Sequence, residues 1–420
     1  MTSDSLVQLE RVVEEHDELL TARYDRYQLF SVFQPIYSFA HKRMVGCEGL
    51  TRVLDDNGGQ IHPGQLLGGR HSIEETIYLD RLMRTLHVGN FSIRKRENAW
   101  LFLNVSPVVV INGHQHGDFF ADLLAKYDFP PQRVVIEILE TAIADEYALE
   151  ATVASYQELG CMVAIDDFGA GHSNFERIWR LRPDIVKLDR SMIQRATTDP
   201  TIGRSLGLIV SLLHEIGGLV LAEGIETEEQ AMLAITADVD MMQGFLLSGA
   251  ATLKEPIPDC QRLFERLHDS IMQTSIDEEF EFLRSFRSYY DAFSRAANML
   301  SAGLNLYTAT EEIISMGEVL RIYVLNEYGA QIGENLTSPE QAVKRDPRLY
   351  PLTEARGASW GHRPYFRRAI SRPGEVQLTR PYLSLTDARM CLTLSRTIQL
   401  RNERAVLCCD LAWHSGHTNK

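Results

Sequence analysis

The sequence predicts an α/β fold in two parts: a modified (β/α)8 TIM-like barrel with an antiparallel first strand, and a smaller α+β domain after it. Between Phe30 and Ser248, eight short β-rich runs alternate with amphipathic helical stretches, and repeated strand–helix units form a parallel sheet that eight strands can close. Only the piece around His41–Arg43 joins the first two runs. That piece is too short for a parallel crossover and therefore predicts an antiparallel hairpin. After Ser248 one long helical run leads into strand-rich sequence, which is typical of a separate α+β domain.

Length and charge limit the class of protein. The chain has 420 residues, with 42 Lys and Arg against 57 Asp and Glu, and the net charge of −15 is spread along it. A general nucleic-acid binder needs a basic face, so we do not expect DNA as a partner, although a nucleotide whose phosphates meet metal ions stays compatible. No apolar run approaches the ~18 residues that span a bilayer, no signal peptide is recognisable, and the six cysteines lack disulfide or zinc spacing. We expect a cytoplasmic protein.

The N-terminal segment and the barrel follow in order. Residues 1–28 have helical periodicity, with Leu6, Leu9, Val12 and Val13 on one face, so a helical segment is predicted there. The barrel is predicted over 29–256. Its eight strands are FSVFQPIYSF, MVGCEGLTRVL, AWLFLNVS, VVIEILET, CMVAIDDFG, IVKLDR, LVLAEGIE and DMMQGFLL.

A break in the pattern is predicted at KEPIPD, residues 254–259. A connecting segment is predicted over 257–304, helical from about Cys260 to Leu304, and a strand-rich domain over 305–420. A hairpin is expected about Glu327–Gly329, and Cys408–Cys409 on a later strand predicts one buried and one exposed thiol.

The pattern from the long helix through WGHRPYFRRAI and RPYLSLTDARMCLTLSRTI resembles the small PAS/Cache sensor domains. An aromatic–arginine cluster in this stretch has two interpretations. It lines a pocket for an unknown small molecule, with Arg363 or Arg380 pairing a carboxylate, or it is ordinary core with arginine at the rim. Its members are Trp360, Arg363, Tyr365, Phe366 and Tyr382.

Polar side chains stand at the ends of strand after strand of the predicted barrel. In barrels of this class the active site lies at the carboxyl ends of the strands, so these side chains should meet at one mouth. Carboxylates gathered there repel one another unless cations neutralise them, and oxygen ligands without His or Cys favour Mg²⁺ or Mn²⁺. The residues are Gln34, Glu48, Asn104, Glu137, Asp166, Asp167, Lys187, Glu223 and Gln243.

The adjacent pair Asp166–Asp167 is informative because neighbours in a regular strand point to opposite faces. At a strand end where the backbone turns, both side chains can reach the mouth, and a shared Asp can bridge two metals. Two ions ~3.5–4 Å apart clamp the attacking and leaving oxygens of a phosphodiester. The competing interpretation is a turn or helix N-cap before Gly169.

In combination these motifs resemble the EAL-domain cyclic di-GMP phosphodiesterases over roughly 30–250. The run Glu48–Arg52 (EGLTR) is similar to the family signature with Gly49 in place of Ala. The other matching pieces are QPI at 34–36, NVS at 104–106, EILE at 137–140, DDFGAGHS at 166–173, DIVKLD at 184–189, AEGIET at 222–227 and QGF at 243–245.

The resemblance implies a role for each residue. Glu48, Asn104, Glu137 and Asp166 would hold a first Mg²⁺ or Mn²⁺ ion, while Asp166, Asp167 and Glu223 would serve a second. Lys187 would orient the attacking water, and Glu223 or the metals would lower the effective pKa of that water. Arg52 and Gln34 would contact substrate, Gln243 would hold the polar network, and Glu140 would brace the loop after Asp167.

The resemblance further implies hydrolysis of cyclic di-GMP to linear pGpG, with Ca²⁺ inhibitory because its looser coordination shell misplaces the two-metal geometry. Departures from the family pattern are Gly49, Asn174 in the loop and a missing proline after Leu247. We expect a homodimer whose C-terminal domain regulates the barrel through the loop Phe168–Asn174. Two alternatives stay open: a non-hydrolysing cyclic di-GMP receptor that signals to a partner, and a sensor that uses the barrel mainly for dimerisation.

Overall fold

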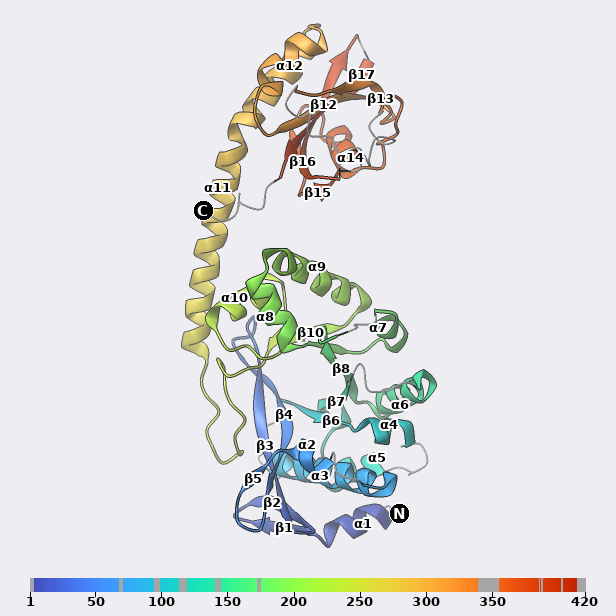
Figure 1. Ribbon diagram of the computed structural model, residues 1–420, viewed down its shortest axis with the longest axis vertical. Coiled ribbons are helices and arrows are strands. Elements are labelled where there is room, and N and C mark those ends of the chain that lie inside the picture. Colours follow the sequence, from blue (N-terminus) through green and yellow to red (C-terminus); the bar gives the residue numbers. More distant parts are fainter. Residues whose placement is uncertain are drawn as a thin grey trace. The chain divides into compact units, whose positions relative to one another are not determined.

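The computed structural model describes residues 4–67, 71–93, 99–112, 119–139, 145–171, 175–338, 355–384, 386, 388–401 and 403–413. The chain divides into two compact units, Met1–Ile271 and Met272–Lys420, whose elements are labelled in Figure 1. No helix of the described residues is both long and apolar enough to cross a membrane.

Eight strands of the first unit close the predicted barrel, and each falls on one of the eight predicted runs. Strand β4 and strands β6 to β11 are parallel neighbours in chain order, whereas β3 pairs antiparallel with both β4 and β11 and so closes the ring. The antiparallel first hairpin is therefore confirmed. The barrel strands are β3 (Tyr27–Ser38), β4 (Arg43–Leu54), β6 (Trp100–Asn104), β7 (Val134–Leu139), β8 (Met162–Phe168), β9 (Ile185–Leu188), β10 (Leu219–Ala222) and β11 (Met241–Met242).

Helices cover the outside of this ring (Figure 1). They bury a large apolar core between themselves and the strands. Local sequence sets their ends: Asp145 caps α6 by accepting a hydrogen bond from the Ala148 N–H, and Gly160 ends it with φ +96°. The helices are α2 (Pro63–Leu67), α3 (Ile73–Ile93), α4 (Pro107–Asn112), α5 (Phe119–Lys126), α6 (Glu146–Leu159), α7 (Phe175–Leu181), α8 (Arg190–Thr198), α9 (Pro200–Ile216) and α10 (Glu228–Thr236), with a short η2 (Pro131–Arg133).

A compact apolar plug fills the barrel interior. Phe102 is its largest member, and a side chain at Gly46 on the neighbouring strand would approach the Phe102 ring to 2.8 Å, so glycine there makes room for it. This layer is the floor on which the polar mouth residues rest. Its buried members are Ile36, Phe102, Val135, Ala164, Ile185, Leu221 and Met241.

The helical prediction for 1–28 is wrong beyond Glu10. Only α1 (Asp4–Glu10) is helical, and β1 (Val13–His16) and β2 (Leu19–Tyr24) form an antiparallel hairpin that extends the sheet at β3. Asp17 and Glu18 at its tip have φ of +52° and +64°, which short turns require and a helix forbids. A further short strand, β5 (Gln60–Ile61), pairs antiparallel with the end of β4.

The second unit is an antiparallel sheet with helices on both faces. The helix α11 (Gln261–Ser301) occupies the predicted helical run, and its later half packs with α12 (Leu306–Ile314) on one face. On the other face α14 (Pro364–Ser371) packs through Tyr365 and Phe366. The sheet order is β13-β12-β17-β16-β14, with β15 also on β16. The strands are β12 (Val319–Asn326), β13 (Gln331–Leu336), β14 (Gln377–Leu378), β15 (Tyr382–Leu383), β16 (Met390–Leu400) and β17 (Glu403–Ala412).

Two details of the second unit bear on the sequence predictions. The hairpin about Glu327–Gly329 is confirmed, because β12 and β13 pair across it. The prediction of one exposed thiol in Cys408–Cys409 is wrong, since both side chains are buried. The reason is that β17 is a central strand: Cys409 belongs to the core on one face of the sheet, and Cys408 belongs to the core on the other.

We predict that Phe102→Ala lowers the free energy of unfolding of the barrel by about 3–5 kcal/mol, the usual cost of removing a buried phenyl ring. Differential scanning calorimetry of the full chain should show the loss in the barrel transition alone. The matched control is Phe293→Ala, which removes a fully buried ring from the core of the second unit and should lower only the other transition. Equal losses in both transitions from either variant would contradict two separate cores.

Candidate active site

The polar mouth residues lie one layer above the apolar plug. Side chains two residues apart on a strand share a face, so the residue two positions beyond each plug residue faces the mouth. Asn104 follows Phe102 in this way, Glu137 follows Val135, and Asp166 follows Ala164. The same step leads to Lys187, Glu223 and Gln243, and on the reversed strand β3 it leads back from Ile36 to Gln34. The alternation of the strands thus positions these seven residues.

Glu48 is held by two amides. The Asn104 Nδ2 donates to its Oε1 at 2.8 Å, and the Gln243 Nε2 donates to its Oε2 at 2.8 Å. Burial raises the pKa of Glu48, but Lys187 and these two hydrogen bonds outweigh it and lower the pKa below its ordinary value. Glu48 is therefore an ionised carboxylate in a fixed orientation, with partners from both sides of the ring.

Lys187 is the buried cation at the centre of the mouth, with only 1 % of its side chain exposed. Its Nζ lies 2.5 Å from Glu137 Oε1, 2.6 Å from Glu223 Oε1 and 3.1 Å from Asp166 Oδ1. Burial would lower its pKa, but Asp166, Glu137 and Glu223 raise the pKa well above the ordinary lysine value. The ammonium therefore stays charged and gathers three carboxylates.

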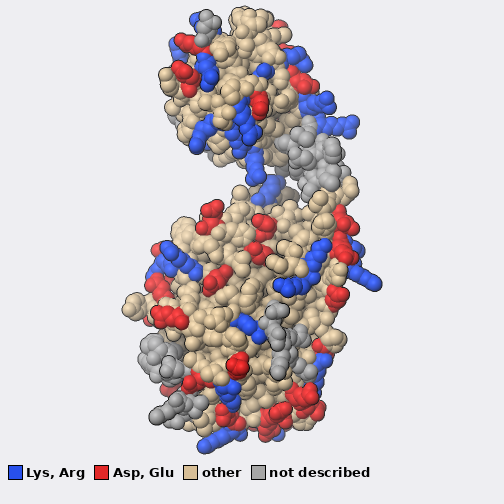
Figure 2. All heavy atoms as spheres, turned by 180° about the vertical axis from the view of Figure 1, so that it is seen from behind, with Lys and Arg blue, Asp and Glu red and all other residues tan. Residues whose placement is uncertain are grey.

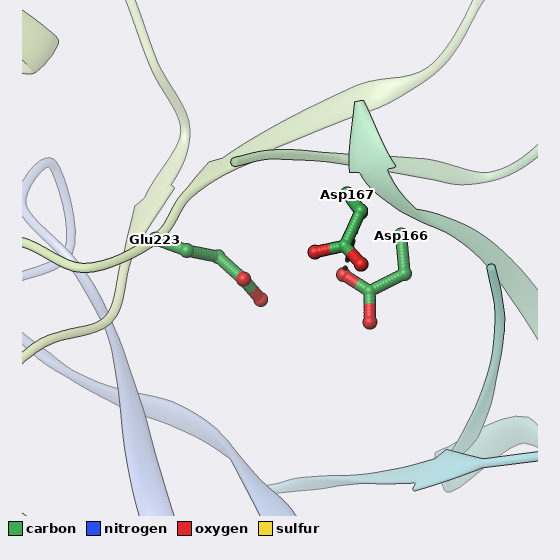
Figure 3. A group of neighbouring side chains, drawn as sticks. All are labelled: Asp166, Asp167 and Glu223. Carbon is green, nitrogen blue, oxygen red and sulfur yellow. Dashed lines mark hydrogen bonds between the residues drawn. The ribbon is translucent and has the colours of Figure 1, made fainter. Parts of the chain in front are cut away.

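Asp166 and Asp167 both reach the mouth, as the turned strand end predicts. The pairing of β8 with β9 is irregular between Ile165 and Phe168, and Asp167 has φ +60°, so the second side chain is rotated toward the first. The Asp167 N–H also donates to Asp166 Oδ1 at 2.9 Å. Figure 3 shows the two carboxylates from β8 facing Glu223 from the end of β10, and oxygens of all three lie within 4.8 Å of one another.

These carboxylates share one ammonium, and the pKa values of three of them are raised. Burial raises the pKa of Glu223 to about 8, with further increases from Asp166 and Glu48 that Lys187 only partly offsets. Burial and the charge of Glu48 raise the pKa of Glu137 well above its ordinary value. Burial and Asp166 raise that of Asp167. At neutral pH some of these groups hold protons in place of a missing positive charge.

The donor set fits divalent cations. Among the described residues, the buried Glu137 Oε2 and Gln243 Oε1 have no hydrogen-bond partner, and a buried polar atom without a partner indicates a missing water or ion. The converging atoms are carboxylate and amide oxygens, the ligands that Mg²⁺ and Mn²⁺ prefer. Glu48, Asn104, Glu137 and Asp166 can hold one ion, and Asp166, Asp167 and Glu223 can hold another.

A pocket of about 690 Å³ opens beside the metal-ligand candidates, a size that suits a nucleotide. Asn104 and Arg52 line it together with residues of β5, α2 and α3. Arg52 forms no ion pair with any described residue, and its Nη1 donates to the Thr51 carbonyl at 3.1 Å. Gln34 Nε2 donates to the Ser248 carbonyl at 3.2 Å, so its side chain is tied to the segment after the last strand.

One residue that supports the Asn104 strand end was not predicted from the sequence. Asp80 on α3 accepts a hydrogen bond from the Ser106 N–H at 2.8 Å, directly after the Asn104 strand end, and pairs with Arg84 Nε at 2.7 Å. Polar residues three and four positions apart on an otherwise buried helix face were the available signal. Glu140 and the loop residues 172–174 lie outside the described residues, so their predicted roles stay predictions.

Comparison with known proteins identifies the family of the first unit. The family model described as EAL domain matches residues 16–250. Among curated proteins, the chain is 30 % identical to the signaling protein YkoW of Bacillus subtilis over 245 residues, which is 56 % of this chain and 28 % of YkoW. It is 27 % identical to the cyclic di-GMP phosphodiesterase RocR of Pseudomonas aeruginosa over 231 residues, 53 % of this chain and 58 % of RocR. The chain thus spans about a quarter to three fifths of these relatives.

A third relative matches both units. The chain is 27 % identical to the uncharacterized EAL-domain containing protein YkuI of Bacillus subtilis over 350 residues, covering 81 % of this chain and 83 % of YkuI. The crystal structure of YkuI with substrate cyclic di-GMP and calcium superposes with a TM-score of 0.78 at 21 % identity, covering 98 % of this chain and 99 % of that one. At this identity the likeness establishes the fold, including that of the second unit.

We predict that the affinity for Mn²⁺ rises with pH. Because the Glu223 pKa is raised to about 8, its carboxyl is neutral at pH 6–7 and must lose a proton to bind a cation. Affinity should therefore increase about tenfold per pH unit for each proton displaced and level off above pH ~8. Calorimetric titration with Mn²⁺ between pH 6 and 8.5 measures this, and Glu223→Gln should flatten the profile. An affinity independent of pH in the unmodified protein would contradict the assignment.

Proposed function

This chain belongs to the EAL domain family, and from that premise we propose that its barrel hydrolyses cyclic di-GMP to linear pGpG with the help of divalent cations. The observation that carries the proposal is the convergence of Glu48, Asn104, Glu137, Asp166, Asp167 and Glu223 around Lys187 at the barrel mouth. The relative RocR is named a cyclic di-GMP phosphodiesterase, which supports the choice of substrate.

Two ions of Mg²⁺ or Mn²⁺ suit this mouth. Asp166 would be shared between them, because it lies between the Lys187 group and the Asp167–Glu223 group. When bound, such ions activate a water as nucleophile at neutral pH and neutralise charge that develops on the phosphodiester. The protein's own part is to fix the ligand oxygens and to manage the protons.

Lys187 and Glu223 form the proton-handling pair. Their Nζ and Oε1 atoms lie 2.6 Å apart, so a donor and an acceptor meet at one point of the mouth. With the cations bound, Glu223 would be an ionised carboxylate at the mouth, and a carboxylate within reach of the attacking water can act as a general base. Glu223 would take the proton of the attacking water, while the Lys187 ammonium would hold that water by donating to its oxygen.

The pocket beside the mouth suits a dianionic dinucleotide. Arg52 forms no ion pair with a described residue, and a guanidinium in that state is a ready partner for a phosphate oxygen. Gln243 donates to Glu48, and Gln34 lies opposite Glu48 in the β3–β4 register; Gln243 would hold the polar network and Gln34 would contact substrate. The retention of every candidate ligand favours the enzyme over the non-hydrolysing receptor.

The second unit is proposed as a sensor of a small carboxylate-bearing molecule. The Arg363 guanidinium lies 5.9 Å from the Trp360 ring centroid and 6.0 Å from that of Tyr382. The space beside it that reaches the buried Arg321–Asp410 pair is about 20 Å³, room for about one water molecule. The interpretation of these aromatics as core also holds in part, because Tyr365 and Phe366 are buried in the sheet–helix core.

Two further expectations belong with this proposal. We retain the homodimer, supported by the exposed Trp179 on α7 and Tyr147 on α6, since large exposed aromatics are enriched at interfaces. We also retain a cytoplasmic location. All six cysteines are buried thiols, and a reducing compartment keeps cysteines as thiols.

The test of the proposed function is to incubate the full chain with cyclic di-GMP and Mg²⁺ or Mn²⁺ and to separate the nucleotides. We predict conversion to pGpG, and we predict that Glu48→Ala, Asn104→Ala and Asp166→Ala each abolish it, because each removes a metal-ligand oxygen. Ca²⁺ should support substrate binding with little turnover. Intact cyclic di-GMP bound by the unmodified protein in Mg²⁺ and Mn²⁺ would instead support the receptor.

Lys187 and Glu223 give a separate kinetic prediction. Lys187→Ala and Glu223→Gln should lower kcat by about 100-fold or more, the usual scale for general acid–base groups, with a smaller change in KM. Steady-state kinetics at saturating Mn²⁺ measures both. Arg52→Ala is the matched comparison, since a substrate contact should mainly raise KM. A normal kcat with only a raised KM in the Lys187 or Glu223 variants would show that the assigned roles are wrong.

A further inference from the structure

His87 packs against the α3 side of the hairpin that carries Glu48 and Arg52, and it also lines the pocket of about 690 Å³. It projects from α3 and is 5 % exposed. Its ring contacts both strands: Phe33 of β3 meets it edge-on at 6.2 Å between centroids, and Gly49 of β4 faces its Cγ. The contacts therefore cross the antiparallel seam between β3 and β4.

Both ring nitrogens are engaged across this seam. His87 Nδ1 lies 2.9 Å from Ser31 Oγ, and Nε2 lies 3.2 Å from Thr51 Oγ1. Ser31 and Thr51 are direct cross-strand partners. One imidazole thus ties together a matched pair of positions on two strands, and its orientation is fixed at both ends.

Gly49 provides the space for this ring. A Cβ atom at position 49 would lie 2.9 Å from His87 Cγ, closer than Cβ atoms approach, and 3.1 Å from its Cβ, a tight contact. The ring cannot retreat without losing both hydrogen bonds. The glycine that replaces the signature alanine of the family is therefore matched to a histidine on α3.

The opposite face of the same residues is the mouth. Neighbouring residues on a strand alternate in direction, so Glu48 and Arg52 point away from His87 while Gly49 and Thr51 point toward it. Glu48 pairs in register with Gln34, and Arg52 pairs with Phe30. A change in the seam is transmitted directly to a candidate metal ligand and a candidate substrate contact.

We infer that His87 is a positioning residue that sets the direction of Glu48 and Arg52 by clamping the β3–β4 hairpin from the α3 side, with Gly49 as its complement. This inference rests on the proposed metal-dependent function of the mouth. It explains the departure at Gly49 as one half of a matched pair and adds a residue to the machinery that no comparison assigns.

A double-mutant cycle in the full chain tests the inference, with the Mn²⁺ dissociation constant as the main readout. His87→Ala should weaken Mn²⁺ binding about tenfold or more, the range seen when supports behind metal ligands are removed. Gly49→Ala should also weaken binding in the unmodified background. In the His87→Ala background the same change should be neutral or favourable, because the new methyl group fills space that the ring has left.

A control on the same helix separates positioning from stability. Asn90, one turn further along α3, is buried and holds β2 through two hydrogen bonds to Leu20, at 2.7 and 2.8 Å. Asn90→Ala should lower the Tm without changing Mn²⁺ affinity. Thr51→Val, which removes only one of the hydroxyl partners, gives a milder variant of the clamp in case His87→Ala does not fold, and should weaken Mn²⁺ binding in the same direction.

The outcomes are distinct. A Gly49→Ala effect that disappears or reverses in the His87→Ala background supports the clamp, whereas equal effects in both backgrounds, or unchanged Mn²⁺ affinity in His87→Ala and Thr51→Val, would overturn it. The proposed function fails separately: an unmodified chain that binds Mn²⁺ but leaves cyclic di-GMP intact contradicts hydrolysis and still permits the cycle to be read. An unmodified chain that binds no Mn²⁺ would overturn both.

Discussion

Five carboxylates share one buried ammonium at the mouth of the barrel, and this charge imbalance is the constraint on which the rest of the site depends. Lys187 pairs with Glu137, Asp166 and Glu223, and Glu48 and Asp167 add two more negative charges nearby. Burial, together with the neighbouring carboxylates, raises the pKa values of Glu137 and Glu223, so that without further positive charge protons fill the deficit. Carboxylates this close together cannot all stay ionised without nearby positive charge. Divalent cations would supply that positive charge in place of protons.

The fold supplies the rigidity that such a cluster needs. The apolar plug around Phe102 sets the height at which the mouth residues sit, and the irregular end of β8 turns Asp167 beside Asp166. On the face shown in Figure 2, acidic and basic side chains are interspersed over the described residues. A charge cluster held by buried strands can bind ions without first paying the entropy of ordering its ligands.

The barrel was predictable because its signal is local and repeated. An apolar residue followed two positions later by a polar one, as in Phe102 and Asn104 or Ala164 and Asp166, marks the step from plug to mouth on strand after strand. The N-terminal hairpin was missed because Leu6, Leu9 and Val12 fit a helical stripe, while the left-handed turn at Asp17 and Glu18 has no such strong signature. His87 was missed for another reason. Its partners Ser31, Gly49 and Thr51 lie 36 to 56 positions away, and only the folded hairpin brings them together.

The most direct test of the account is anomalous diffraction from crystals of the full chain grown with Mn²⁺. Two strong peaks are expected in the mouth, one among Glu48, Asn104, Glu137 and Asp166, and one among Asp166, Asp167 and Glu223, with Lys187 displaced from at least one carboxylate. Their occupancy should fall together when the crystals are brought to lower pH. A mouth that shows no anomalous peak at saturating Mn²⁺ and pH 8 would contradict the claim that cations, and not protons alone, balance this charge.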